Sequence, residues 1–126
     1  MMKQIINSSK APAPIGPYSQ AIKSGNILYV SGQIAIDQSS GKLVDSSIEE
    51  ETKQVMINIG YILEEAGINY SHILKCSIFI NNMEQFAQIN GIYGEYFPEN
   101  PPARETVEVS RLPKDVNVEI SCVAHL

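Results

Sequence analysis

Two strand-like segments with apolar residues on both faces constrain the fold most strongly. They are NILYVSGQIAI at residues 26 to 36 and HILKCSIFI at residues 72 to 80. Side chains alternate across a strand, so a strand with one face in water alternates between apolar and polar residues. Because these two segments do not alternate in this way, we expect the sheet that contains them to be covered on both faces. Gly32 within the first segment predicts a bulge or a close approach of another group to the backbone.

One layer of that cover comes from an amphipathic helix predicted at residues 47 to 66. Ser47 and Glu50 have the spacing of a capping box at its start, and Gly67 is placed to end it. Five apolar residues recur at helical spacing and form one stripe. They are Val55, Ile59, Ile62, Leu63 and Ala66. The stripe predicts that this helix packs on the sheet.

The remaining segments predict a mixed α/β (α+β) domain. A second helix is expected from about residue 82 to residue 97, ending at Pro98, and a stiff proline-rich loop at residues 11 to 21. Short strands are expected at residues 3–6, 43–44, 104–110 and 116–124. This order, β-β-β-α-β-α-β-β, predicts two helices on one face of a mixed sheet. The sequence offers no third layer, so a symmetric oligomer is the simplest cover for the second face.

Composition narrows the classes of function. The chain has 126 residues, 44% of them hydrophobic and 18% charged, which fits one domain spanning residues 1 to 126. Its net charge of −5 and its scattered nine basic residues argue against a nucleic-acid partner. Its apolar runs are too short to span a membrane, and its first residues lack the apolar stretch of a secretory signal. We expect a cytoplasmic protein without a membrane partner.

Two cysteines and two histidines raise the possibility of a metal site. His72 and Cys76 are four residues apart, and Cys122 and His125 are three apart. Neither spacing matches a strong zinc pattern. We therefore expect no metal, and we expect both cysteines to be reduced thiols packed in the core.

Alternation along the two last strands brings polar residues together. If these strands form a hairpin about the LPKD turn, Arg104, Thr106, Glu119 and Ser121 share one face, with Thr106 opposite Ser121 in one allowed register. Arg104 has a planar guanidinium that suits a carboxylate ligand. The alternative is an ordinary edge-strand arginine paired with a neighbouring glutamate, Glu105 or Glu108. The residues alone leave both interpretations open.

Several longer motifs point to a family. APAPIGPYSQA, LYVSGQI, GKLV, FAQINGIYGEYF and PPARETVEVSRLPKDVNVEI stand in this order along nearly the whole chain. In order and spacing they resemble the RidA family, also called YjgF/YER057c/UK114. The resemblance implies a chorismate-mutase-like fold and a homotrimer with an inner β-barrel, helices outside and pockets at the subunit interfaces. It also implies hydrolysis of reactive 2-enamine and 2-imine acids to 2-oxo acids and ammonia, with no cofactor or metal.

The same resemblance implies roles for individual residues. Arg104 corresponds to the arginine that binds the substrate carboxylate, and Thr106 contacts the ligand through its backbone. Tyr18, expected from the neighbouring subunit, corresponds to the pocket tyrosine. The remaining substrate-binding residues implied are Ser31, Gly32 and Asn90.

The sequence departs from the family at its end. Deaminating members commonly read EIE, with the second glutamate positioning the attacking water, whereas this chain reads VEIS and has Ser121 there. A hydroxyl is a poor base at neutral pH, and Glu119 is either a substitute or a structural residue. The alternative function is therefore a weakly catalytic or non-catalytic module that binds small carboxylates. A third, RNA cleavage, disagrees with the acidic composition.

Overall fold

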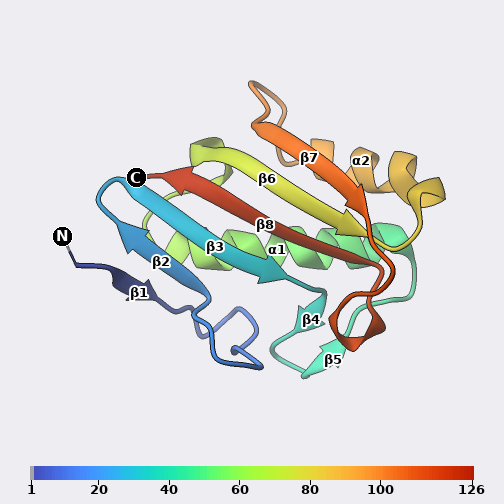
Figure 1. Cartoon of the computed structure of the whole chain (residues 1–126), viewed down its shortest axis with the longest axis horizontal. Coiled ribbons are helices and arrows are strands. Elements are labelled where there is room, and N and C mark those ends of the chain that lie inside the picture. Colours follow the sequence, from blue (N-terminus) through green and yellow to red (C-terminus); the bar gives the residue numbers. More distant parts are fainter. Residues whose placement is uncertain (1) are drawn as a thin grey trace.

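The computed structural model describes residues 2–126 and contains a six-stranded mixed sheet with both α-helices on one face (Figure 1). The sheet has the strand order β1-β2-β3-β8-β6-β7. Its strands are β1 Gln4–Ile6, β2 Ala21–Ser24, β3 Ile27–Gln33, β6 Ile73–Ile80, β7 Ala103–Glu108 and β8 Val118–His125. Neighbouring strands are antiparallel except β6 and β7, which are parallel. A separate two-stranded ribbon contains β4 Ile36–Asp37 and β5 Lys42–Leu43.

The long helix α1, Ile48–Glu65, forms where its sequence pattern predicts it. The Ser47 side chain accepts a hydrogen bond from the backbone N–H of Glu50 at the start, which confirms the predicted cap. The chain leaves the helix through Gly67, whose φ of +79° is costly for residues with a side chain. Helix α2 is shorter than predicted, Phe86–Gly94, because a 3-10 turn at Met83–Gln85 precedes it.

The core lies between the helices and the sheet. Helix α1 contributes its predicted stripe, and the strands contribute every second residue. Fully buried strand residues include Leu28, Cys76, Ile80, Val118 and Ile120. Cys76 and Cys122 are both free thiols and buried, as predicted. They lie opposite one another in the ladder between β6 and β8.

The other face of the sheet carries apolar side chains that no α-helix among residues 2–126 covers, although Phe79 at one end packs against a small buried cluster around Leu112. Tyr29 on β3 is 52% exposed and Val107 on β7 is 42% exposed. Phe79 and Val123 pair with these residues in the ladders and share their face. The predicted two-faced apolar character of the sheet is therefore present, and its second face is open in a single copy.

The predicted hairpin between the last two strands is wrong. Strand β6 lies between β7 and β8, parallel to the former and antiparallel to the latter. Paired residues share a face, so Arg104 and Thr106 lie with Cys76 and Ile78 on the helix side. Glu119 and Ser121 lie on the opposite side. The apolar residues of the two strands face opposite sides of the sheet, and matching them to one another therefore gave the wrong pairing.

Two further differences concern the start of the chain. The sequence prediction missed β2, which directly follows the proline-rich loop. The segment predicted as one strand at residues 26 to 36 is divided into β3, which ends at Gln33, and β4, which begins at Ile36. Within β3, the ladder with β8 shifts register between Val30 and Gln33. This shift contains Gly32 and confirms the predicted bulge.

Candidate functional site

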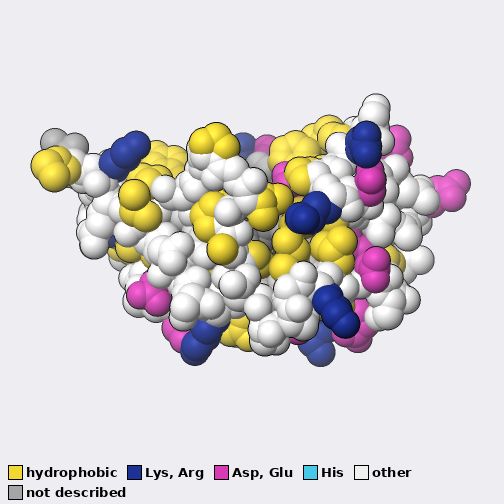
Figure 2. Space-filling model, turned by 90° about the horizontal axis from the view of Figure 1, so that it is seen from below, with side chains coloured by type: hydrophobic (Ala, Val, Ile, Leu, Met, Phe, Trp, Pro, Cys, Tyr) yellow, Lys and Arg dark blue, Asp and Glu magenta, His cyan; other side chains and the backbone are white. Residues whose placement is uncertain are grey.

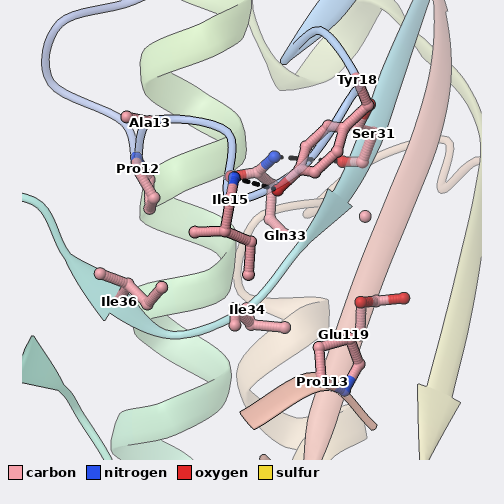
Figure 3. A pocket seen from close by; sticks show the side chains of 11 residues that line it. Pro12, Ala13, Ile15, Tyr18, Ser31, Gln33, Ile34, Ile36, Pro113 and Glu119 are labelled. Atoms are coloured by element: carbon pink, nitrogen blue, oxygen red, sulfur yellow. Dashed lines mark hydrogen bonds between the residues drawn. The ribbon is translucent and has the colours of Figure 1, made fainter.

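A cavity of about 300 Å³ opens where the proline-rich loop meets the end of β3 and the start of β8 (Figure 3). Polar groups lie toward one side and apolar side chains toward the other. The lining residues are Pro12, Ala13, Ile15, Tyr18, Ser31, Gly32, Gln33, Ile34, Ile36, Pro113 and Glu119. Three residues implied by the family resemblance, Tyr18, Ser31 and Gly32, are therefore brought together with Glu119.

Glu119 lies against the backbone of the bulge in β3. A Cβ atom built on Gly32 would be 2.8 Å from the Glu119 carboxyl carbon, so any other residue at this position would force the carboxyl to move. Partial burial raises the pKa of the Glu119 carboxyl above its usual range. A carboxylate whose pKa is raised and which lies beside a cavity is a candidate proton acceptor.

The polar end of the cavity is held by the loop that precedes β2. The Tyr18 hydroxyl accepts a hydrogen bond from the backbone N–H of Ile15 at 3.2 Å, and Ser31 Oγ donates to the carbonyl of Ser19 at 2.6 Å. Gln20 is buried, and its amide nitrogen donates to the carbonyls of Ser8 and Pro12 at 3.1 and 3.0 Å. The prolines exclude a regular ladder here, so these side-chain bonds fix the loop.

Gln20 was missed in the sequence analysis. The sequence contains one indication of its role, because Gln20 directly follows IGPYS at the end of the proline-rich loop. A polar side chain at this position can form hydrogen bonds with the unpaired backbone groups of the loop.

Arg104 belongs to a second group of residues at the outer edge of the sheet. Its guanidinium donates to Asn90 Oδ1 on α2 at 2.7 Å and lies 5.5 and 5.2 Å from the ring centroids of Phe86 and Tyr93. Thr106, two residues along β7, has a buried hydroxyl without a hydrogen-bond partner among residues 2–126. Arg104 and Asn90, both implied by the resemblance, are thus in direct contact.

The structure does not pair Arg104 with a neighbouring glutamate, which was the alternative interpretation. Glu105 forms an ion pair with Lys75 at 2.8 Å, and Glu108 accepts a hydrogen bond from the backbone N–H of Met83 at 2.7 Å. Among residues 2–126, no carboxylate forms an ion pair with Arg104. The exposed guanidinium is therefore available to a carboxylate from outside the chain.

The two groups do not meet within one chain. Strands β8 and β6 separate β3 from β7, which corresponds to roughly 14 Å at the usual strand spacing. Arg104 also lies on the helix side of the sheet, whereas Glu119 lies on the open side. A ligand that contacts both must lie between two copies of the chain.

Ser121 lies apart from both groups. It is paired with Ser77 of β6 and does not line the cavity, although it shares a face with Glu119. The two side chains are about 6 to 7 Å apart along β8. Among residues 2–126, no group of three or more His, Cys, Asp and Glu residues is arranged to hold a metal ion. No helix in this part of the chain is both long and apolar enough to cross a membrane.

The chain is similar to known proteins over nearly its whole length. Residues 8–126 match the family model described as Endoribonuclease L-PSP. A RutC family protein of Pyrococcus horikoshii is 50% identical over 124 residues, covering 98% of each chain. The 2-iminobutanoate/2-iminopropanoate deaminase of Bos taurus is 40% identical, covering 98% of this chain and 90% of its own.

A solved structure from the Rid family, YyfA of Yersinia pestis, superimposes with a TM-score of 0.96 at 48% identity, covering 99% of this chain and all of its own. Its fold and that of its relatives is the predicted chorismate-mutase-like arrangement of two helices on a mixed sheet. The chain therefore belongs to the YjgF/YER057c/UK114 family, the RidA family.

Proposed function

We propose that the protein hydrolyses reactive 2-enamine and 2-imine acids, of the 2-aminoacrylate and 2-aminocrotonate type, to 2-oxo acids and ammonia, in pockets formed between copies of a homotrimer. The observation that carries the proposal is the position of Glu119, whose carboxyl lines a cavity together with Tyr18, Ser31 and Gly32. The bovine relative supports the reaction through its name. Each pocket combines this cavity with Arg104 and Asn90 of a neighbouring copy.

The two groups of residues that form each proposed pocket have complementary roles. Arg104, oriented by Asn90, binds the substrate carboxylate with its planar fork. Glu119 of the other copy orients a water molecule and accepts its proton as the water oxygen bonds to the imine carbon. That proton passes to the nitrogen and gives a carbinolamine. Transfer of the remaining hydroxyl proton to the nitrogen, as the carbon–nitrogen bond breaks, then releases ammonia and leaves the 2-oxo acid, so the net reaction consumes one water. The raised pKa of Glu119 makes its carboxylate a stronger base, which favours removal of the proton from water.

The apolar face of the sheet supports assembly into a trimer. Tyr29, Phe79, Val107 and Val123 form an apolar surface that one copy leaves open. Packing these faces against one another buries them in an inner barrel, and an edge strand such as β7 is then next to a neighbouring copy. Analytical ultracentrifugation tests this part, with a trimer expected and a monomer contradicting it.

Ser121 is not required in this scheme, although the family pattern motivated a weakly catalytic alternative. Its position outside the cavity makes Glu119 the proposed water-orienting group. RNA is not expected as a partner. Figure 2 shows Lys and Arg side chains standing singly among acidic and apolar ones on the face drawn there, without the basic stripe that phosphates require.

A coupled assay tests the proposed reaction. A threonine or serine dehydratase generates the imine in place, and its loss and the release of ammonia are followed with and without micromolar protein. We expect faster release of ammonia, abolished by Arg104→Ala. Binding of 2-oxobutyrate by calorimetry without any acceleration of hydrolysis would contradict the proposed reaction and support the carboxylate-binding alternative.

A further inference from the structure

A buried glutamate that does not line the cavity is bonded to the start of β8. Glu51, in the first turn of α1, is 1% exposed. One of its carboxyl oxygens accepts from the backbone N–H groups of Asn117 and Val118, at 2.7 and 3.2 Å. The other accepts from Asn117 Nδ2 at 2.7 Å. All three partners are donors, so the position requires two acceptor oxygens, which a carboxylate has and an amide lacks.

These bonds hold the chain where a short 3-10 turn, Pro113–Asp115, leads into β8. The two residues Lys114 and Asp115 have left-handed φ values of 55° and 56°, so the chain reaches β8 through an irregular turn. Asn117 is also joined to Asn81, whose backbone N–H donates to its carbonyl at 3.2 Å. Beyond this point, Val118 begins the ladder with β6. Glu51 and Asn81 together therefore set where β8 begins.

Glu119 is the second residue of that strand and is paired on one side only. Its partner in β6 is Phe79, whereas the ladder between β3 and β8 begins at the pair Gln33 and Ile120. On the β3 side, the Glu119 side chain meets the bulge at Gly32 with no space to spare. A small displacement of Asn117 and Val118 is therefore passed directly to the Glu119 carboxyl.

We infer that Glu51 is a positioning residue, which orients Glu119 toward the cavity through its bonds to Asn117 and Val118. The effect on kinetics that this inference predicts rests on the proposed function. Glu51 does not touch substrate, and it acts on Glu119 rather than on Arg104, which lies on another strand and the other face of the sheet. Its replacement therefore alters the chemical step more than the binding of the substrate carboxylate.

Glu51→Gln tests this, because it preserves shape but replaces the oxygen that accepts from Asn117 Nδ2 by an NH2 donor. Two donors then face each other, and Asn117 must move. We expect kcat to fall by about 10- to 100-fold, since misplacement of a reacting group by about 1 Å has effects of this size, while KM stays close to the wild-type value. In the Glu119→Gln background, the same change should cost no further activity, because the residue through which it acts is gone. An equal loss of kcat in both backgrounds would overturn the inference.

Thr52→Val is the matched control. Thr52 is the next residue on α1, is fully buried, and its hydroxyl donates only to the carbonyl of Ile48 within the helix. This variant should leave kcat unchanged even where it lowers the melting temperature. A fall in kcat as large as that of Glu51→Gln would show that any disturbance of α1 suffices and would overturn the role given to Glu51. If Glu51→Gln does not fold, Asn117→Ala removes only the Nδ2 donor, and a smaller fall in kcat at constant KM is expected.

A measurement that does not depend on catalysis distinguishes failure of this inference from failure of the proposed function. In backbone amide spectra of the ¹⁵N-labelled protein, Glu51→Gln should move the signals of Gly32 and Glu119, and Thr52→Val should leave them in place. This result would stand even if the wild type lacked deaminase activity. Unchanged signals of both residues in folded Glu51→Gln would overturn the inference regardless of activity.

Discussion

At the scale of single residues, the difference between Glu119 and Ser121 is one of position. Glu119 lines the cavity, and Ser121 does not. Glu119→Gln should therefore lower kcat by roughly 10²- to 10⁴-fold, the usual effect of losing a general base. Ser121→Ala should change kcat little in the coupled assay. A large gain of activity in Ser121→Glu, with full activity in Glu119→Gln, would reverse this assignment.

The burial of Glu119 also predicts how stability depends on pH. The folded-state pKa of this carboxyl is raised, so the folded protein holds the proton more tightly than the unfolded chain, whose glutamates titrate near pH 4.3. The contribution of Glu119 to stability is thus lost as pH rises through that value and toward the folded-state pKa. Glu119→Gln should melt at a higher temperature than the wild type at pH 7, with the difference shrinking toward pH 4.

The control for the pH measurement is Glu65→Gln, which removes an exposed carboxylate at the end of α1. Its difference from the wild type should not follow this pH dependence. Equal melting temperatures of Glu119→Gln and wild type across the range would contradict the burial argument.

The exposed guanidinium of Arg104 predicts a distinct kinetic effect. Arg104→Lys keeps the charge but loses the planar fork, and Arg104→Ala loses both. We expect kcat/KM to fall in both variants, more steeply for alanine, with a rise in KM and weaker binding of 2-oxobutyrate by calorimetry. Lys53→Ala removes one exposed positive charge from α1 and should retain wild-type binding. Equal losses in Lys53→Ala would show that only net charge matters.

At the scale of elements, the bulge in β3 and the start of β8 fit one another closely. A Cβ at Gly32 would collide with Glu119, whereas a Cβ at Gly91 in α2 would meet nothing within 4 Å. Gly32→Ala should fold but lose most of its activity, because the carboxyl must move. Gly91→Ala should keep its activity and gain about 0.5 to 1 kcal/mol of stability from helix propensity. Activity assays and thermal melts of this matched pair check both expectations.

Prediction from sequence succeeded where a local pattern determined an element. The α1 helix has a cap, a complete apolar stripe and a terminal glycine, and each of these is decided within a few residues. The bulge at Gly32 was predicted for the same reason, since an isolated glycine interrupts an otherwise regular strand. The helix α2 started later than expected because Asn82 caps a 3-10 turn first.

Prediction failed where pairing between distant segments decided the outcome. Strand alternation correctly placed Glu119 and Ser121 on one face, but it did not show that β6 would separate β7 from β8. That insertion places Arg104 on the helix side, in contact with Asn90 and two aromatic rings of α2. The family resemblance named Arg104 and Asn90 as substrate-binding residues, but the strand pattern did not predict their contact.

At the scale of the whole molecule, the separation of Arg104 from Glu119 predicts complementation between variants. If each pocket takes Arg104 from one copy and Glu119 from another, Arg104→Ala and Glu119→Gln are each inactive alone. Co-expressed or refolded together in equal amounts, they should yield mixed trimers in which roughly a quarter of the pockets are intact. Ammonia release by the mixture, and not by either variant, is the expected result. Failure of verified mixed trimers to regain activity would show that no pocket combines Arg104 of one copy with Glu119 of another.

The position of β8 has a consequence for how the chain folds during synthesis. Strand β8 is the last of the six in sequence, yet it lies between β3 and β6 near the middle of the sheet. While the ribosome is still making residues 118–125, β3 and β6 have no partner along these edges, and the nascent chain cannot close its core. Chains stalled before this strand emerges should therefore remain sensitive to protease, and completion of β8 should convert them to a resistant form in one step.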